Sequence, residues 1–314
     1  MNTKVTQIDH VLTRGVQEII GKDKIITMLH AGKPLRIKYG IDPTATSFHL
    51  GHTVPLRKLK EFQELGHTAV FIIGDYTAQI GDPVGKSETR TMLTLKQTQD
   101  NAKEFTHLAA KFMDIEKAEV HFQSSWYNSI TLEQTIRLMA TVTKEQLMRH
   151  ETFRMREREG KPLGFHEMFY TLLMAFDSVA VKADIELGGP DQKFNFLVTR
   201  QVMERYSLKA QEALLLRYLP GTDGAEKMSK STNNFVGLDE DPLVQLVKLM
   251  KIRDENIPTF FDLLTDSTVQ PNEHPIAAKR RLAKLIVSDC HDRSAAKTAD
   301  QQFFAGHPQL KNML

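Results

Sequence analysis

The sequence predicts an α/β protein with a doubly wound parallel sheet, inserted helices and a helical C-terminal segment. Three observations support this fold class. Strand-like and helix-like segments alternate in the first third of the chain, one strand-like segment is continuously apolar, and the last third shows only helical patterns. Continuously apolar strands are typical of parallel sheets that helices cover on both faces.

The first third is predicted as β–α–β–α–β. Residues 35–41 alternate around β-branched side chains and are expected to form a strand. Apolar residues then recur at helical spacing over 51–65, with Pro55 tolerable in the first turn. A strand over 68–74, a helix over 95–113 and a strand over 118–123 complete the series. This order is that of a Rossmann-like sheet.

The rest of the chain divides into three parts. Residues 131–160 are predicted as two helices within an insertion at about 124–163. A helix over 165–181, a strand over 184–189, a helix over 190–206, a strand over 214–219 and a polar loop over 220–235 return to the sheet. The pattern is helical from 240 onward, including an amphipathic helix over 276–289. We therefore expect a first domain over 1–236 and a helical segment over 237–314.

Composition narrows the class of protein. The 314 residues are 41% apolar and 25% charged, as in soluble globular proteins with a sizeable core. Lys and Arg number 41 against 39 for Asp and Glu, so contact with nucleic acid would need a local patch. The single cysteine, Cys290, excludes an internal disulfide framework. No signal-peptide core and no apolar run near 18 residues is present, so a cytoplasmic location is expected.

A histidine pair opens the helix after the first strand. The stretch SFHLGHTVPL, residues 47–56, lies where parallel sheets bind ligands. Gly51 would let a ligand approach the backbone, and His49 and His52 share one side of the helix start. Helix N-termini attract anions and imidazoles donate hydrogen bonds to phosphate, so a polyphosphate fits. Alone, such a pair is more often structural, and zinc would need further ligands.

A second motif lies in the polar loop. The stretch GTDGAEKMSKS, residues 221–231, carries Lys227 and Lys230 one turn apart. Two ammonium groups could neutralise charge on a departing pyrophosphate. A solvated surface loop is the alternative for a lysine pair at this spacing.

Together the two motifs resemble the paired signatures of class I aminoacyl-tRNA synthetases. The segments IDPTATSFHLGHTVPLRKL, IGDYTAQIGDPVGKSETR and ELGGPDQKFN resemble the catalytic domain of tyrosyl-tRNA synthetases, in their second bacterial branch, and the similarity runs over about 30–305. The resemblance implies that tyrosine and ATP form tyrosyl-adenylate and pyrophosphate, and that the tyrosyl group then passes to tRNA(Tyr). It also implies a Rossmann-like fold.

The resemblance assigns nucleotide contacts residue by residue. The residues expected to act on the phosphates are Thr44, His49, His52, Lys86, Arg90, Lys227 and Lys230. Those expected to bind the rest of ATP are Gly40, Asp42, Gly51, Gly189, Asp191, Met228 and Ser229, with Gly189 and Asp191 at the ribose. Mg²⁺ is expected to arrive with ATP, and no protein-bound metal is expected, because no carboxylate cage is evident.

The resemblance also implies an amino-acid pocket formed by Lys38, Tyr39, Asp82, Tyr170, Met174, Asp177 and Gln192. Asp177 would accept a hydrogen bond from the phenol, and it interrupts an apolar helix, where an unpaired carboxylate is costly. Asp82, Tyr170 and Gln192 would surround the ammonium group. Met174 stands where the family usually has glutamine, and Lys38 where other branches carry a phenol-binding tyrosine.

Partners and alternatives follow from the same resemblance. The family is dimeric through its inserted helices, so a homodimer is expected. It also continues into a small RNA-binding module, which is expected to be absent here and whose loss would weaken tRNA binding. Met174 and that loss would suit a paralogous adenylating enzyme with another amino acid or a non-tRNA acceptor. A non-catalytic binding protein is a further alternative, against which the retained polar residues argue.

Overall fold

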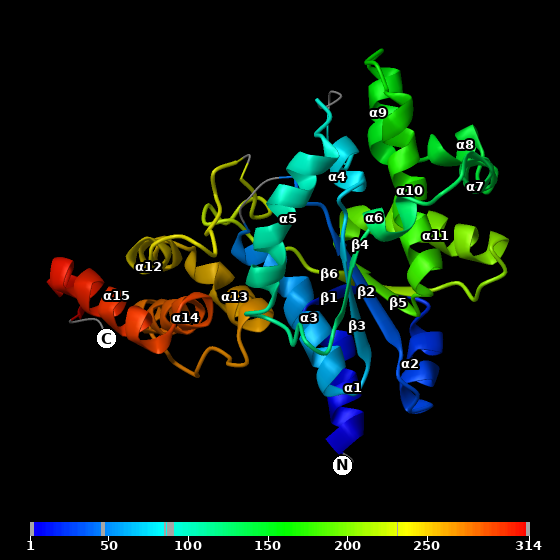
Figure 1. The fold of residues 1–314 in the computed structure, drawn as a ribbon. Helices are drawn as coiled ribbons and strands as arrows, with labels where there is room; N and C mark the ends of the chain where they lie inside the picture. Colours follow the sequence, from blue (N-terminus) through cyan, green and yellow to red (C-terminus); the bar gives the residue numbers. More distant parts are fainter. Residues whose placement is uncertain (1–2, 45–47, 85, 87–90, 231, 312–314) are drawn as a thin grey trace.

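A six-stranded sheet forms the centre of the molecule (Figure 1). The computed structural model describes residues 3–44, 48–84, 86, 91–230 and 232–311. In the order β1-β6-β5-β2-β3-β4, the strands are β1 (Val16–Ile20), β6 (Glu212–Leu216), β5 (Ile185–Gly188), β2 (Arg36–Ile41), β3 (Thr68–Ile73) and β4 (Glu119–Phe122).

Five of the six strands are parallel, which confirms the predicted fold class. The exception is β1, which pairs antiparallel with β6 at the edge of the sheet and was not predicted. Its sequence VQEII carries two polar residues and lacks the apolar run of an inner strand. The strand expected over 214–219 is β6 and begins two residues earlier, at Glu212.

Helices cover both faces of the sheet, and α3 and α5 lie opposite α10 and α11 (Figure 1). The helices of this part are α1 (Thr3–Thr13), α2 (Lys22–His30), the short η1 (Leu50–His52), α3 (Thr53–Glu64), α4 (Thr77–Ile80), α5 (Leu95–Ala109), α10 (Phe165–Val181), η2 (Pro190–Gln192) and α11 (Lys193–Arg205). Strand β3 shows how its sequence serves both layers. Phe71 packs in the core that includes α3 and α5, whereas Val70 packs beside the end of α10.

The prediction of two helices over 131–160 is wrong, because the structure has three. The inserted helices are α6 (Ser124–Tyr127), α7 (Leu132–Met139), α8 (Lys144–Leu147) and α9 (Glu151–Arg158). The Thr131 side chain accepts from Gln134 N at the start of α7, and Thr143 accepts from Gln146 N at the start of α8. This second capping box starts a new helix where the apolar spacing suggested continuity.

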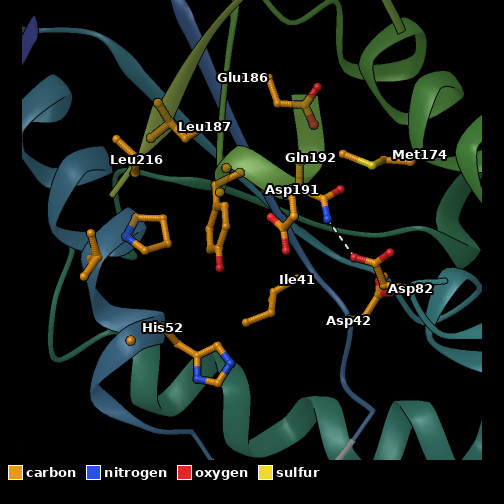
Figure 2. A pocket seen from close by; sticks show the side chains of 18 of the residues that line it. Ile41, Asp42, His52, Asp82, Met174, Glu186, Leu187, Asp191, Gln192 and Leu216 are labelled. Carbon is orange, nitrogen blue, oxygen red and sulfur yellow. Dashed lines mark hydrogen bonds between the residues drawn. The ribbon is translucent and has the colours of Figure 1, made fainter. Parts of the chain in front are cut away.

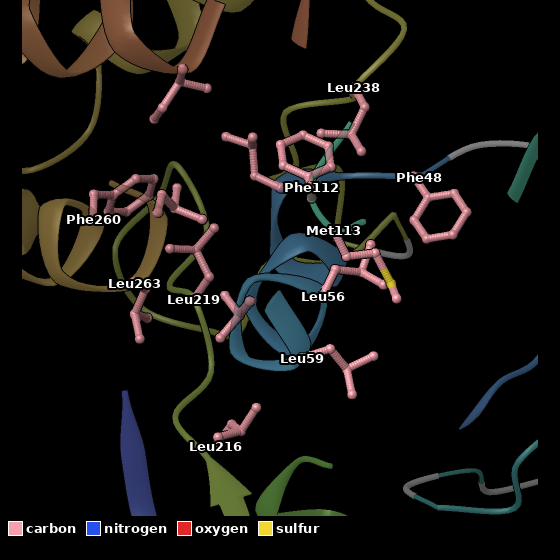
Figure 3. Packing of buried hydrophobic residues seen from close by; sticks show 14 of the residues in the cluster. Phe48, Leu56, Leu59, Phe112, Met113, Leu216, Leu219, Leu238, Phe260 and Leu263 are labelled. Carbon is pink, nitrogen blue, oxygen red and sulfur yellow. The ribbon is translucent and has the colours of Figure 1, made fainter. Parts of the chain in front are cut away.

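The chain ends in a helical cluster that shares its core with the sheet domain. It contains α12 (Pro242–Met250), η3 (Asp254–Asn256), α13 (Ile257–Leu264), α14 (Pro275–Cys290), α15 (Arg293–Gly306) and α16 (Pro308–Lys311). Figure 3 shows Phe260 and Leu263 of α13 near Leu56 and Leu59 of α3, and all four belong to one buried cluster. Full burial of one such side chain stabilises the fold by about 1.5–3 kcal/mol.

Helices α7, α8 and α9 of the insertion and the C-terminal helices lie at opposite ends of the molecule (Figure 1). Within the described ranges, we find no helix with both the length and the apolar character needed to cross a bilayer.

Candidate active site

A cavity of about 380 Å³ opens beside the carboxyl ends of β2, β5 and β6 (Figure 2). This is the edge at which parallel sheets bind ligands. The structure brings most of the expected site residues to its wall. These are Lys38, Tyr39, Gly40, Asp42, His49, Gly51, His52, Asp82, Tyr170, Met174, Asp177, Gly189, Asp191, Gln192, Lys227, Met228 and Ser229.

Four expected residues are not among those that line the cavity. In the described part of the chain, Thr44, Lys86 and Lys230 do not belong to its wall. Thr44 lies just beyond it, where its backbone N–H donates to the Asp42 carbonyl at 2.8 Å. Arg90 lies outside the described residues.

The histidine pair has a defined tautomer. The backbone N–H of His49 donates to His52 Nδ1 at 3.1 Å, and that of Gly51 donates to His49 Nδ1 at 3.2 Å. In a neutral imidazole the nitrogen that does not accept carries the hydrogen, so Nε2 is the donor in both rings. The ring centroids are 3.9 Å apart. The pair therefore offers two adjacent donors to an anion.

Both rings stay neutral at physiological pH. Burial lowers the pKa of His49 to about 2, with further contributions from His52 and the loop lysines. Burial also lowers the pKa of His52 to about 4. Since neutral rings bring no charge of their own, we note that Lys227 and Lys230 supply positive charge close to them.

Gly51 leaves room for this arrangement. A Cβ at this position would lie 3.0 Å from two atoms of the His49 ring, closer than ordinary van der Waals contact. An alanine would therefore push the ring away from its place beside His52. Gly51 therefore makes room for the His49 ring, and its expected role in ligand approach stays a prediction.

The lysine loop packs against the sheet through its backbone. Met228 is buried and its N–H donates to the Leu219 carbonyl at 2.8 Å. The Ser229 N–H donates to Asn234 Oδ1 at 2.8 Å, and the Asn234 amide donates to Asp223. Sequence reasoning missed Asn234. Its only signal was an asparagine close behind a glycine-rich turn.

Lys227 contacts the residue expected at the ribose. Its Nζ lies 3.1 Å from Asp191 Oδ2 and 4.7 Å from the centre of the Tyr218 ring. The Tyr218 hydroxyl also lies 3.0 Å from the Asp191 N–H. The Asp191 carboxylate is therefore already paired within the protein.

The two signature motifs are joined by backbone hydrogen bonds. The Leu50 N–H donates to the Val236 carbonyl, and the Leu238 N–H donates to the Phe48 carbonyl, each at 3.0 Å. The histidine stretch and the end of the lysine loop therefore lie side by side, although they are far apart in sequence.

Asp177 lies at the opposite end of the cavity and is well supplied with donors. Gln123 Nε2 donates to it at 2.6 Å, and Trp126 Nε1 and the Tyr127 hydroxyl donate at 3.2 Å each. Burial raises the pKa of Asp177 to about 7. The expected unpaired carboxylate is thus hydrogen-bonded within the protein. Sequence reasoning missed all three donors, although Gln123 directly follows the strand β4.

A second cluster of polar side chains surrounds the position that is expected for the ammonium group of the substrate. Figure 2 shows Gln192 donating to Asp82, at 2.7 Å, and Asp42 lies nearby. The Gln192 Oε1 in turn accepts from Asn195 at 2.9 Å. The Tyr170 hydroxyl donates to Asp42 at 2.9 Å. Burial is the main cause that raises the pKa of Asp82.

The metal-binding capacity of the site is limited. Across the ranges that the structure describes, no group of three His, Cys, Asp or Glu side chains could hold a metal ion. The sole cysteine, Cys290, is buried in the C-terminal helices, and it takes no part in the cavity.

Fold and cavity together define an α/β enzyme of the nucleotide-binding class, with neutral imidazole donors at one end and a buried carboxylate at the other. The chain matches the family model "tRNA synthetases class I (W and Y)" over residues 30–305, and it belongs to this family.

Among the members of this family, the chain is similar to tyrosine–tRNA ligases. The chain is 43% identical over 314 residues to the tyrosine–tRNA ligase of Dehalococcoides mccartyi (strain CBDB1), covering 96% of this chain and 79% of that protein. It is 44% identical over 297 residues to that of Aquifex aeolicus, covering 93% and 76%.

Solved structures share the fold. The C-terminally truncated mitochondrial tyrosyl-tRNA synthetase of Aspergillus nidulans has a TM-score of 0.80 at 20% identity, with 97% of this chain and 94% of that chain covered. The tyrosyl-tRNA synthetase of Archaeoglobus fulgidus complexed with L-tyrosine has a TM-score of 0.76 at 19% identity, with 92% and 99% covered.

Proposed function

We propose that this chain is a tyrosine–tRNA ligase, which activates tyrosine with ATP and transfers the tyrosyl group to tRNA(Tyr). Relatives of this name match more than nine-tenths of the chain at 43–44% identity. The observation that carries the proposal is one cavity lined by a pair of neutral histidines at one end and by Asp177 at the other.

Activation is an in-line displacement at the α-phosphate. A carboxylate oxygen of tyrosine forms a bond to the α-phosphorus as the bond to the pyrophosphate oxygen breaks. The Nε2–H groups of His49 and His52 would donate to phosphate oxygens in the transition state. Lys227 and Lys230 would leave their resting positions to neutralise the departing pyrophosphate. Catalysis of this kind depends on positioning and charge stabilisation and forms no covalent enzyme intermediate.

The substrate of this step is ATP with its bound Mg²⁺. Gly189 and Asp191 would receive the ribose, and the other proposed nucleotide contacts are Gly40, Asp42, Thr44, Gly51, Lys86, Arg90, Met228 and Ser229. Mg²⁺ would arrive on the phosphates because carboxylates at this end are few.

Tyrosine would lie between two clusters of polar side chains, one around Asp177 and the other around Asp82. Asp82, Tyr170 and Gln192 would surround its ammonium group, and Asp177 would accept the phenol hydrogen. Phenylalanine would leave the buried Asp177 without that partner, which is how such a site rejects an analogue lacking a hydroxyl. Tyr39 and Met174 would form apolar walls beside the ring.

We also propose a homodimer formed through the inserted helices. Leu132, Ile136 and Met139 lie on one face of α7, and Leu132 is 75% exposed. Exposed apolar patches of this kind mark interaction surfaces. Ile136→Asp should give a monomer by sedimentation. Val244→Asp, at an exposed apolar residue of α12, should leave the dimer intact.

We propose in addition that residues 1–236 form the catalytic unit, with the insertion at about 124–163, and that 237–314 form an appended helical unit. The shared core around Leu56 and Phe260 would hold the two together.

ATP–pyrophosphate exchange across the amino acids tests the activation step. We expect exchange with tyrosine and little with phenylalanine or tryptophan. Charging of total tRNA then tests the transfer step. Exchange with another amino acid would contradict the assigned substrate, and tyrosine exchange without tRNA charging would indicate another acceptor. No observation favours the paralogous adenylating enzyme or the non-catalytic protein.

A further inference from the structure

A buried ion pair lies at the closed end of the cavity. Lys38 of β2 and Glu186 of β5 are neighbours in the parallel register of the sheet, and each is only 1% exposed. Their Nζ and Oε1 atoms are 2.7 Å apart. Figure 2 shows Glu186 at the same end of the cavity as Met174. Burial of two charges is costly unless hydrogen bonds satisfy them.

The ammonium of Lys38 also holds one turn of α10. It donates to the Ser178 hydroxyl at 2.7 Å and to the Met174 carbonyl at 3.2 Å. An ammonium has three hydrogens to donate, and Glu186, Ser178 and Met174 accept all of them. Lys38 therefore has no hydrogen left to donate to a phenol. The turn that Lys38 holds contains Asp177.

Asp177 experiences charges from several elements. The titratable groups that face it are Lys38 from β2, Glu186 from β5, Tyr127 from α6 and Tyr170 from α10 itself. Burial raises the pKa of Asp177, Lys38 opposes that rise, and Glu186 adds to it. The two residues of the ion pair thus act on Asp177 in opposite directions.

We propose that Lys38 is a positioning and specificity residue, which orients Asp177 through the 174–178 turn so that it accepts the phenol hydrogen, and which together with Glu186 sets the charge that surrounds this carboxyl group. This deepens the proposed function and rests on it for the identity of the substrate. The resemblance implied that Lys38 binds the amino acid. The structure assigns it an indirect role, because its hydrogens are all taken by the protein.

Three variants separate charge from packing. Lys38→Met removes the positive charge and leaves Glu186, so Asp177 should lose its proton at higher pH. Glu186→Gln removes the negative charge, so Asp177 should lose its proton at lower pH. In the double variant Lys38→Met/Glu186→Gln, the pH at which Asp177 loses its proton should return close to the wild-type value. A charge within about 4–6 Å of a carboxyl group shifts such a midpoint by about one to three pH units.

The structure can accommodate the Glu186→Gln change. Gln211 Nε2 donates to Glu186, and Gln211 Oε1 is buried with no hydrogen-bond partner among the described residues. Rotation of the Gln211 amide would present that oxygen to the new amide hydrogens. Lys58→Met is the matched control, since Lys58 is also buried and paired, with Glu61, but lies outside the cavity wall.

The direct measurement is a titration of the aspartate carboxyl carbons by ¹³C NMR, in which loss of a signal in Asp177→Asn identifies Asp177. A second measurement is the pH dependence of the KM for tyrosine in pyrophosphate exchange. We expect opposite shifts in the two single variants, a small shift in the double variant and none in Lys58→Met.

The outcomes separate the two proposals. Shifts in the same direction, or equal losses of tyrosine affinity without a shift, would overturn the role of Lys38. Absence of tyrosine-dependent exchange in the wild type would instead overturn the proposed function, while the NMR titration would still decide the role of Lys38.

Discussion

The two ends of the cavity, which we propose for the amino acid and for the nucleotide, are made from different kinds of segment. Lys38, Asp177 and Glu186 are at most 3% exposed and come from strands and a long helix. Lys227 and Asp191 come from a loop and a short 3-10 turn, and the Lys227 side chain is 51% exposed. At the first end each polar group has several partners, whereas at the second Lys227 is held by one carboxylate and one ring.

This difference suits the two tasks that we propose for the cavity, amino-acid recognition and stabilisation of pyrophosphate. Recognition of an amino acid needs donors and acceptors that stay in place, so that a wrong substrate leaves buried groups unpaired. Stabilisation of a departing pyrophosphate needs cations that reach the charge as it develops, and exposed side chains on loops can move. Changes at the nucleotide end should therefore affect rates, and changes at the amino-acid end should affect selectivity.

The largest expected effect is at the nucleotide end. Lys230→Ala should lower kcat for activation by roughly 100- to 1,000-fold, because a charge that acts only in the transition state is lost. The KM for tyrosine should change little. Steady-state pyrophosphate exchange measures both, with Lys251→Ala at an exposed position as the control. Equal effects on kcat and on tyrosine affinity would contradict the proposed division of tasks between the two ends of the cavity.

The next effect is at the amino-acid end. Asp177→Asn should lower kcat/KM for tyrosine by about 10- to 100-fold, since a hydrogen bond to a charged group is worth about 1.5–3 kcal/mol. Values for phenylalanine should stay nearly constant, so the preference for tyrosine shrinks. Competition between the two amino acids in the exchange assay measures this preference. An unchanged ratio would place the phenol elsewhere.

A smaller effect is expected at the ribose. Asp191→Asn should raise the KM for ATP by about tenfold, because the amide is a weaker acceptor for ribose hydroxyls than a carboxylate. The KM for tyrosine should stay the same. Asp254→Asn, at an ion pair with Lys279 outside the cavity wall, is the control. A rise in both KM values would indicate that the two ends are coupled.

The smallest effect concerns pH and stability. The pKa of His52 is lowered to about 4, so between about pH 6.5 and 4 the unfolded chain binds a proton that the folded chain does not. Stability should therefore fall as the pH drops through this window. Urea unfolding at about pH 7.5 and about pH 5 should show His52→Asn losing about 1–2 kcal/mol less than the wild type. An equal loss in both proteins would contradict a neutral buried ring.

The sequence predicted most of the sheet and both motifs, because local patterns determine them. The apolar run of β3 and the histidine stretch after β2 are visible within short windows. Strand β1 was not predicted, because an edge strand tolerates polar residues. The break between α7 and α8 was not predicted either, because a capping threonine outweighs helical spacing.

The closed end of the site was predicted less completely. Asp177 was singled out by the family resemblance and by its mismatch with an apolar helix, but its donors come from α6 and from the residue after β4. The contacts of Lys38 depend on the register between β2 and β5. Such pairings are made between distant segments, and neither composition nor periodicity contains them.

The backbone bonds that join residues 48–50 to residues 236–238 have a consequence for how this protein tolerates change. These bonds use main-chain atoms only, but the side chains of Phe48, Leu50, Val236 and Leu238 are all buried in the core. Apolar side chains of similar volume should therefore keep the spacing between the imidazoles and the lysines, whereas polar or much smaller ones should not. Proline is the exception, since at 50 or 238 it would remove the donated hydrogen. The relative placement of the two motifs thus depends on main-chain hydrogen bonds together with the apolar core that covers them.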